Sequence, residues 1–187
     1  YQHVPDTLRL GYVYEFPFRN RSTRGKNWMA KLVAGWSLGG FLSIESGSPV
    51  FVASPNDSNS FGGGNGMRPN ATAQAAKLPG ADRLVDGALY FNPLAFSRTP
   101  PHSFGNVSRT LPDVRTPGSL NLDALLTKRL LSRGAVAADL RVEVFNATNT
   151  VLYAGPETSI TSGDFARIRI TQVNTPRQIQ FGLRVTF

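Results

Sequence analysis

The stretch RQIQFGLRVTF (residues 177–187) decides the fold of this 187-residue chain. Every second side chain in it is apolar, while glutamine, glycine, arginine and threonine fill the positions between. A period of two places successive side chains on opposite faces of a β-strand. The stretch therefore predicts a strand with one apolar and one polar face, whose apolar positions are Ile179, Phe181, Leu183, Val185 and Phe187.

The same alternation recurs upstream and predicts an all-β chain of about five long antiparallel strands in meander order. Globular strands average roughly 5 to 6 residues, whereas a tilted strand needs roughly 9 to 11 to cross a bilayer. The alternating segments of this chain have the length of membrane-crossing strands. A tight turn is expected at 132–134. The strands are expected at 7–18, 35–52, 119–131, 136–145 and 177–187, and two long connections at 53–118 and 146–176.

Charged residues within the expected strands follow the polar alternation. Two exceptions, Lys128 and Arg177, fall at expected strand ends, where a long side chain reaches the interface. A soluble β-sandwich also alternates, but a basic residue facing lipid at mid-depth costs roughly 2 to 4 kcal/mol, and none falls there. The pattern favours a transmembrane barrel with these lumen-facing charges: Arg9, Glu15, Glu45, Asp123, Arg129, Asp139, Arg141, Glu143 and Arg184.

Aromatic residues gather toward the ends of the first two expected strands. Barrels carry aromatic girdles at both membrane interfaces, although aromatics in a soluble core would look similar. The expected interfacial aromatics are Tyr12, Tyr14, Phe16, Phe18 and Trp36.

The composition excludes several other classes of protein. Charged residues make up only 17% of the chain, against roughly 25% for a soluble domain. Cysteine is absent, and no apolar run is long enough for a membrane-spanning helix. The net charge of +8 suits anionic lipid headgroups, because five of the 20 basic residues crowd into the 19–33 connection and no nucleic-acid-binding pattern accompanies them.

The order of connection lengths is short, long, short, long, as in outer-membrane barrels with short periplasmic turns and long extracellular loops. Five strands are too few to close such a barrel, and open edges in lipid leave backbone groups unsatisfied. The chain also begins at Tyr1 without an initiator methionine or signal peptide. We therefore expect this to be the C-terminal wall of a longer polypeptide that supplies the other strands.

No residues point to catalysis, a metal or a cofactor, so we expect no enzyme. His3 and His102, the two histidines, stand apart from any nucleophile and acid pattern. In the longer connection, Tyr90, Phe91, Phe96 and Phe104 could contact a ligand or pack the loop upon itself. We favour loop packing, since long ordered loops are held by their own side chains.

Two sets of motifs resemble known families. The terminal Phe187 with its alternating apolar residues resembles the C-terminal signal that outer-membrane proteins present to the barrel-assembly machinery. Almost the whole chain resembles Oar-like TonB-dependent receptors, which have a carboxypeptidase-regulatory-like domain, a plug and a barrel. The matching stretches, in the family's order, are LRLGYVYEFPF (8–18), GWSLGGF (35–41), SGSP (46–49), RPN (68–70), YFNPLAF (90–96), FGN (104–106), LNLD (120–123), EVFN (143–146) and PRQIQFGL (176–183).

The resemblance implies a bacterial outer-membrane receptor that takes up a scarce nutrient. Its expected partners are outer-membrane lipid, the remaining barrel and plug of the parent chain, TonB, the barrel-assembly machinery and an unknown small substrate. One alternative is an extracellular structural or adhesive assembly, in which a released piece joins copies through exposed strand edges. Another is a module whose long loops capture glycan or protein.

Overall fold

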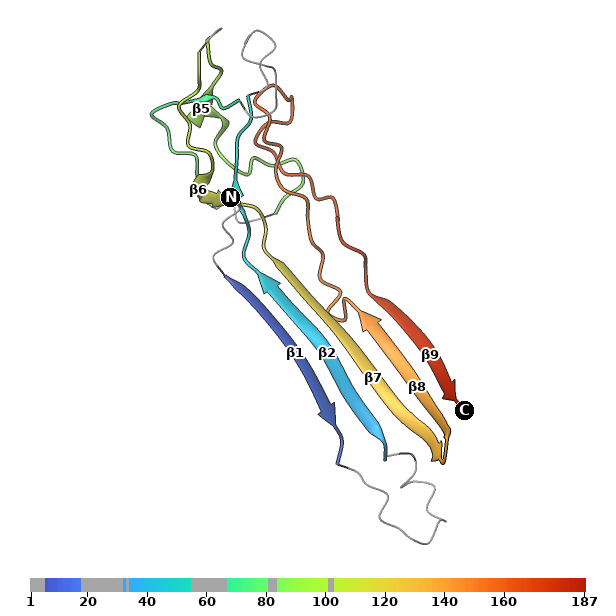
Figure 1. Cartoon of the computed structure of the whole chain (residues 1–187). Coiled ribbons are helices and arrows are strands. Elements are labelled where there is room, and N and C mark those ends of the chain that lie inside the picture. The colour runs from blue at the N-terminus through green and yellow to red at the C-terminus, as the bar shows by residue number, and fades with distance from the viewer. Residues whose placement is uncertain (1–5, 18–31, 33, 55–66, 81–83, 101–102) are drawn as a thin grey trace. The chain divides into compact units, whose positions relative to one another are not determined.

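Figure 1 shows the computed structural model of the chain, which describes residues 6–17, 32, 34–54, 67–80, 84–100 and 103–187. The chain divides into two compact units. The strand unit comprises 7–44, 120–151 and 175–187, and the loop unit comprises 1–6, 45–119 and 152–174. Each unit is described by itself below.

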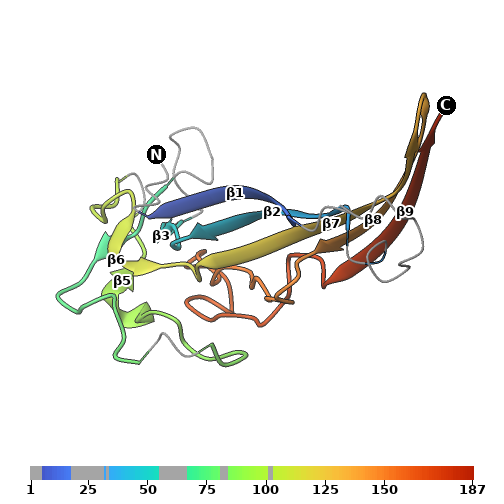
Figure 2. The same cartoon turned by 90° about the horizontal axis from the view of Figure 1, so that it is seen from below.

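The strand unit holds one five-stranded sheet with the order β1-β2-β7-β8-β9. Neighbouring strands run in opposite directions (Figure 1), so the prediction of an antiparallel all-β meander is confirmed. The sheet is open, with β1 and β9 as its outer strands (Figure 2). Its strands are β1 (Thr7–Glu15), β2 (Trp36–Glu45), β7 (Ser119–Arg133), β8 (Val136–Phe145) and β9 (Gln178–Thr186).

Both long connections leave from one end of this sheet, and the tight β7–β8 turn lies at the other end (Figure 1). Gly134 takes a φ of 61° in that turn, a conformation that costs glycine little. The strand directions therefore agree with the expected alternation of short and long connections. The strands are long enough to cross a bilayer.

Several strand ends differ from the sequence-based bounds for local reasons. β1 stops at Glu15, because the backbone N–H of Phe16 makes a last bond to the Trp36 carbonyl and Pro17 has no N–H to donate. The stretch 46–48 lies between strands, where a Cβ on Gly47 would collide with the Thr116 carbonyl. The expected 35–52 strand is therefore divided into β2 and a two-residue strand, β3 (Pro49–Val50).

The loop unit contains two short strand pairs. β3 pairs with β6 (Leu111–Arg115), and β4 (Asn70–Ala71) pairs with β5 (Phe96–Ser97). A short 3-10 turn, η1 (Pro93–Ala95), precedes β5 and is capped by the Asn92 side chain, which accepts a bond from the N–H of Leu94. The 53–118 connection, which lacks any periodic pattern, thus has local structure of its own.

A hydrophobic core holds the loop unit together and draws on both long connections. Phe91 lies edge-on to Phe96 and to Phe165, with ring centroids 5.8 Å and 5.4 Å away. Loop packing is therefore confirmed for Phe91 and Phe96, whereas the Phe104 side chain is 70% exposed. The buried core residues are Val50, Val52, Phe91, Ala95, Phe96, Val107, Leu111, Val114 and Ala166.

Polar contacts also tie the second long connection to the first. The backbone of Tyr90 donates to Ala166, and that of Ile168 donates to Ala88. At the surface, Arg169 donates to both carboxylate oxygens of Asp164 at 2.9 Å, and this bond and charge raise the pKa of Arg169. The guanidinium is therefore charged at any working pH.

Among the described residues, no helix has both the length and the apolar character needed to span a membrane.

Candidate functional site

The charged residues predicted to face a lumen share one face of the sheet. The register pairs Arg129 with Asp139, and Asp139 with Arg184, so these three form a row across β7, β8 and β9. A Cβ on Gly11 of β1 would touch Phe41 of β2, which places the odd-numbered residues of those strands together. Strand alternation then puts all of the predicted lumenal charges on this one face, with Glu45 at the end of β2.

Within this polar face, opposite charges approach one another. The Arg129 Nε lies 3.2 Å from the Asp139 carboxylate. In the next row, Arg141 stands opposite Gly182, and the Arg141 Nε is buried without a hydrogen-bond partner among the described groups. Glu143 stands opposite Gln180. The face is thus a mixed-charge polar wall, and its orientation toward a lumen stays a prediction.

Asp123 has a structural role in this wall. One carboxylate oxygen accepts from the Asn121 side chain at 3.0 Å, and the other accepts from the backbone N–H of Asn146 at 2.9 Å. Asn146 has a φ of 48°, and its amide bonds the carbonyls of Thr150 and Thr175. Asp123 therefore helps to organise the beginning of the long β8–β9 connection.

The opposite face is apolar and exposed. Leu140 of β8 stands between Lys128 of β7 and Leu183 of β9. Leu8 and Ile179, on the outer strands, are 53% and 57% exposed, so the apolar residues do not meet in a dry interior. The exposed residues of the C-terminal alternation are Ile179, Phe181, Leu183, Val185 and Phe187, of which Phe187 lies beyond β9.

The aromatic residues take different positions on the strands. Tyr14 and Phe16 pack edge-to-face at the end of β1, 5.1 Å apart, and Trp36 opens β2. Tyr12 lies in the middle of β1, where its hydroxyl occupies the space that a Cβ on Gly40 would need. Because Gly40 has no side chain, the Tyr12 ring can lie over it. Phe18 lies outside the described residues.

Lys128 departs from the sequence-based expectation. It lies inside β7 rather than at a strand end, because β7 continues to Arg133 through an irregularity in register between Arg129 and Leu131. Its ammonium is buried and donates to the carbonyls of Leu32 at 2.7 Å and Ala34 at 3.0 Å. It also lies 4.7 Å from the centre of the Trp36 ring. The charge is thus satisfied by two backbone carbonyls of the turn just before β2.

Replacing Lys128 with methionine should destabilise the sheet by about 1 to 3 kcal/mol, because two carbonyls lose a charged donor. A matched change at exposed Arg133, at the end of β7, should stay within about 0.5 kcal/mol. Urea unfolding of the full-length protein in lipid vesicles measures both. Equal stabilities of the two variants would show that these bonds contribute nothing.

A comparison with protein families agrees with a sheet that has one polar and one apolar face. The family model for an outer membrane beta barrel domain matches residues 1–180. The chain belongs to this family. The prediction of a bacterial outer-membrane location is therefore confirmed. No curated protein and no solved structure matches the barrel domain.

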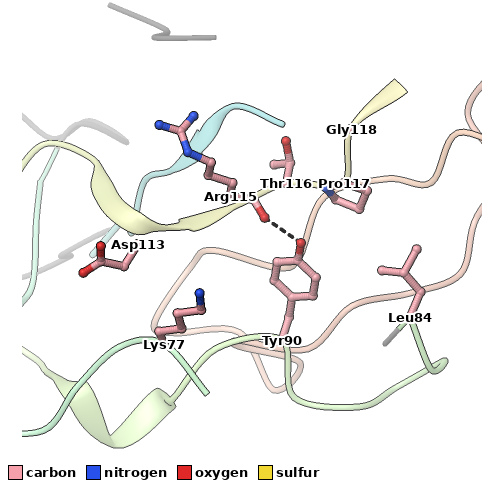
Figure 3. Close-up of a pocket in the computed structure, with 8 residues that line it drawn as sticks. All are labelled: Lys77, Leu84, Tyr90, Asp113, Arg115, Thr116, Pro117 and Gly118. Carbon is pink, nitrogen blue, oxygen red and sulfur yellow. Dashed lines mark hydrogen bonds between the residues drawn. The ribbon is translucent and has the colours of Figure 1, made fainter. Parts of the chain in front are cut away.

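The loop unit of this barrel domain has a hollow of about 460 Å³ on its surface. Figure 3 shows Lys77 extending toward β6, with its ammonium between Asp113 and Tyr90 in this view. The Tyr90 hydroxyl donates to the Arg115 carbonyl at 2.5 Å. Leu84 and Pro117 add apolar surface to the lining. The lining therefore includes two basic residues, Lys77 and Arg115, one carboxylate, an aromatic ring and apolar walls.

The backbone around the hollow is held from several sides. Asp113 lies on β6 beside buried Val114, and β6 pairs with β3. Thr116 exchanges two bonds with Ser48, one through its N–H at 2.8 Å and one through its hydroxyl at 3.0 Å. Sequence reasoning did not find this site, because its residues come from 77 to 118 without a common motif. The aromatic cluster that includes Tyr90 was the one available signal.

Within the described ranges, no three potential metal ligands gather. The histidines His3 and His102 lie outside those ranges.

Proposed function

We propose that this barrel domain is the C-terminal wall of a TonB-dependent receptor that takes up a scarce nutrient, and that it performs no catalysis. The observation that carries the proposal is the common core of the two long connections, in which Phe165 of the second packs on Phe91 and Phe96 of the first. A receptor needs outer loops that hold a fixed surface toward its ligand. The resemblance to Oar-like receptors adds the dependence on TonB.

The two faces of the sheet suit this role. The apolar face would contact outer-membrane lipid, and the polar row of Arg129, Asp139 and Arg184 would line a wide interior. The open edges β1 and β9 would pair with the other strands of the parent chain, which would also carry the plug. Paired strands would satisfy the edge backbone groups that lipid cannot.

The proposal is tested in the source bacterium under nutrient limitation. Deleting the gene should reduce growth or uptake, and deleting the TonB gene in the same strain should add no further loss. The purified full-length protein should also bind the periplasmic domain of TonB. Additive deletions together with no TonB binding would contradict the proposal.

The open edges also favour a second candidate, an extracellular adhesive or structural assembly built through β1 and β9. It predicts ordered polymers in electron micrographs of the chain in detergent-free buffer. A full-length protein found only as a detergent-soluble barrel, with no polymer on cells, would contradict it.

A further inference from the structure

We propose that the hollow of the loop unit binds a small zwitterion that carries one ammonium and one carboxylate, such as an amino acid or a short peptide. This inference rests on the proposed function, because it names the class of cargo that the outer loops would select. It concerns binding at Lys77 and Asp113, which can be measured whether or not TonB drives uptake.

Three charged residues line the hollow. Arg115 donates its guanidinium to the Gly47 carbonyl at 3.0 Å, and the other two, Lys77 and Asp113, are the first support. Lys77 and Asp113 line the same hollow, yet among the described residues they form no ion pair with each other. Both side chains are exposed and thus accessible from solvent. A ligand that carries both charges would pair its carboxylate with Lys77 and its ammonium with Asp113.

The framework behind these side chains is the second support. Asn92 donates its backbone N–H to the Ala76 carbonyl at 2.8 Å and its side-chain amide to the Ala75 carbonyl at 3.0 Å, which fixes the chain just before Lys77. On the opposite wall, Asp113 lies between Leu111 and Arg115, which both pair with β3. A site whose walls are already held loses less entropy when it binds a ligand.

The remaining lining sets the size and character of the ligand. The volume of about 460 Å³ falls in the usual range of small-molecule sites, roughly 300 to 1,000 Å³. The Tyr90 ring, Leu84 and Pro117 give apolar surface for the body of an amino acid or peptide. The main features of the hollow thus have counterparts in such a ligand.

Charge also argues against other ligand classes. The Asp113 carboxylate would repel a phosphate or another polyanion that reached Lys77, and the two basic residues Lys77 and Arg115 would repel a polycation. A neutral sugar would gain little from two opposite charges. Discrimination of this kind depends on repulsion of the wrong ligand as much as on attraction of the right one.

The test is calorimetric titration of the full-length protein in detergent with alanine, dialanine and trialanine. At least one of them should bind. The best binder is then compared with its N-acetyl and C-amide forms, each of which lacks one charge, and with glucose. Each blocked form should bind more weakly by at least about threefold, the size expected for one accessible ion pair.

Two variants test which charged group of the ligand pairs with which side chain of the hollow. Lys77→Met should weaken binding of the unblocked ligand. It should leave the affinity for the C-amide form unchanged, because that form has no carboxylate to pair with Lys77. Asp113→Asn should weaken binding of the unblocked ligand and leave the affinity for the N-acetyl form unchanged, because that form has no ammonium to pair with Asp113. Arg98→Met, a matched loss of charge at an exposed position just after β5, should change none of the affinities.

Several results would overturn the inference: no binding of any of the three zwitterions, equal binding of the blocked forms, or tighter binding of glucose. Binding without TonB-dependent growth would instead contradict the proposed transport and leave the hollow's ligand class intact. TonB binding without any affinity for the zwitterions would contradict the ligand class of the hollow and leave the proposed transport intact.

Discussion

Replacing Phe91 with alanine should unfold the loop unit while the strand unit stays folded. Phe91 is fully buried and touches two other rings, so its loss removes both apolar burial and aromatic packing at the centre of the core. Truncations of this kind cost about 3 to 5 kcal/mol. That is comparable with the whole stability of a small core, so cooperative opening of the unit is expected.

Limited proteolysis of the full-length protein in detergent measures this effect. Cleavage should move into 84–119 and 152–174, while heat-modifiable migration of the barrel stays as in the wild type. Leu94→Ala in the same unit is the control, because this side chain is 65% exposed and its removal should cost less than about 0.5 kcal/mol. If both variants resisted protease equally, the loop unit would not depend on this core.

Placing arginine at Val142 should strongly destabilise the barrel, whereas placing it at Leu125 should not. Val142 lies on the apolar face, between Leu126 and Phe181. An arginine facing lipid near mid-depth costs roughly 2 to 4 kcal/mol. Leu125 lies on the polar face directly opposite Glu143, so an arginine there gains an acidic neighbour.

The two variants change similar apolar residues at nearby depths on adjacent strands, so they differ mainly in the face that they alter. Urea titration of the full-length protein in vesicles gives the free energy of unfolding for each. Val142→Arg should lose about 2 to 4 kcal/mol and Leu125→Arg less than about 1 kcal/mol. The reverse order would place lipid against the charged face.

The site could be predicted only in part. Period-two alternation predicted which charges share a face, and the register of β7, β8 and β9 bears this out for Arg129, Asp139 and Arg184. The environment of Lys128 was predicted wrongly, since nothing in the sequence around it indicates the irregularity beyond Arg129 or the carbonyls of the 32–34 turn.

The sequence by itself determined the long strands, their order in an antiparallel meander and the separation of charged from apolar faces. These properties are local, because each strand's alternation lies within its own few residues. Only the tertiary structure decided that the two long connections share one core and that Lys77 and Asp113 line one hollow. Those contacts join residues far apart in the chain, and their segments have no periodic pattern from which a buried face can be predicted.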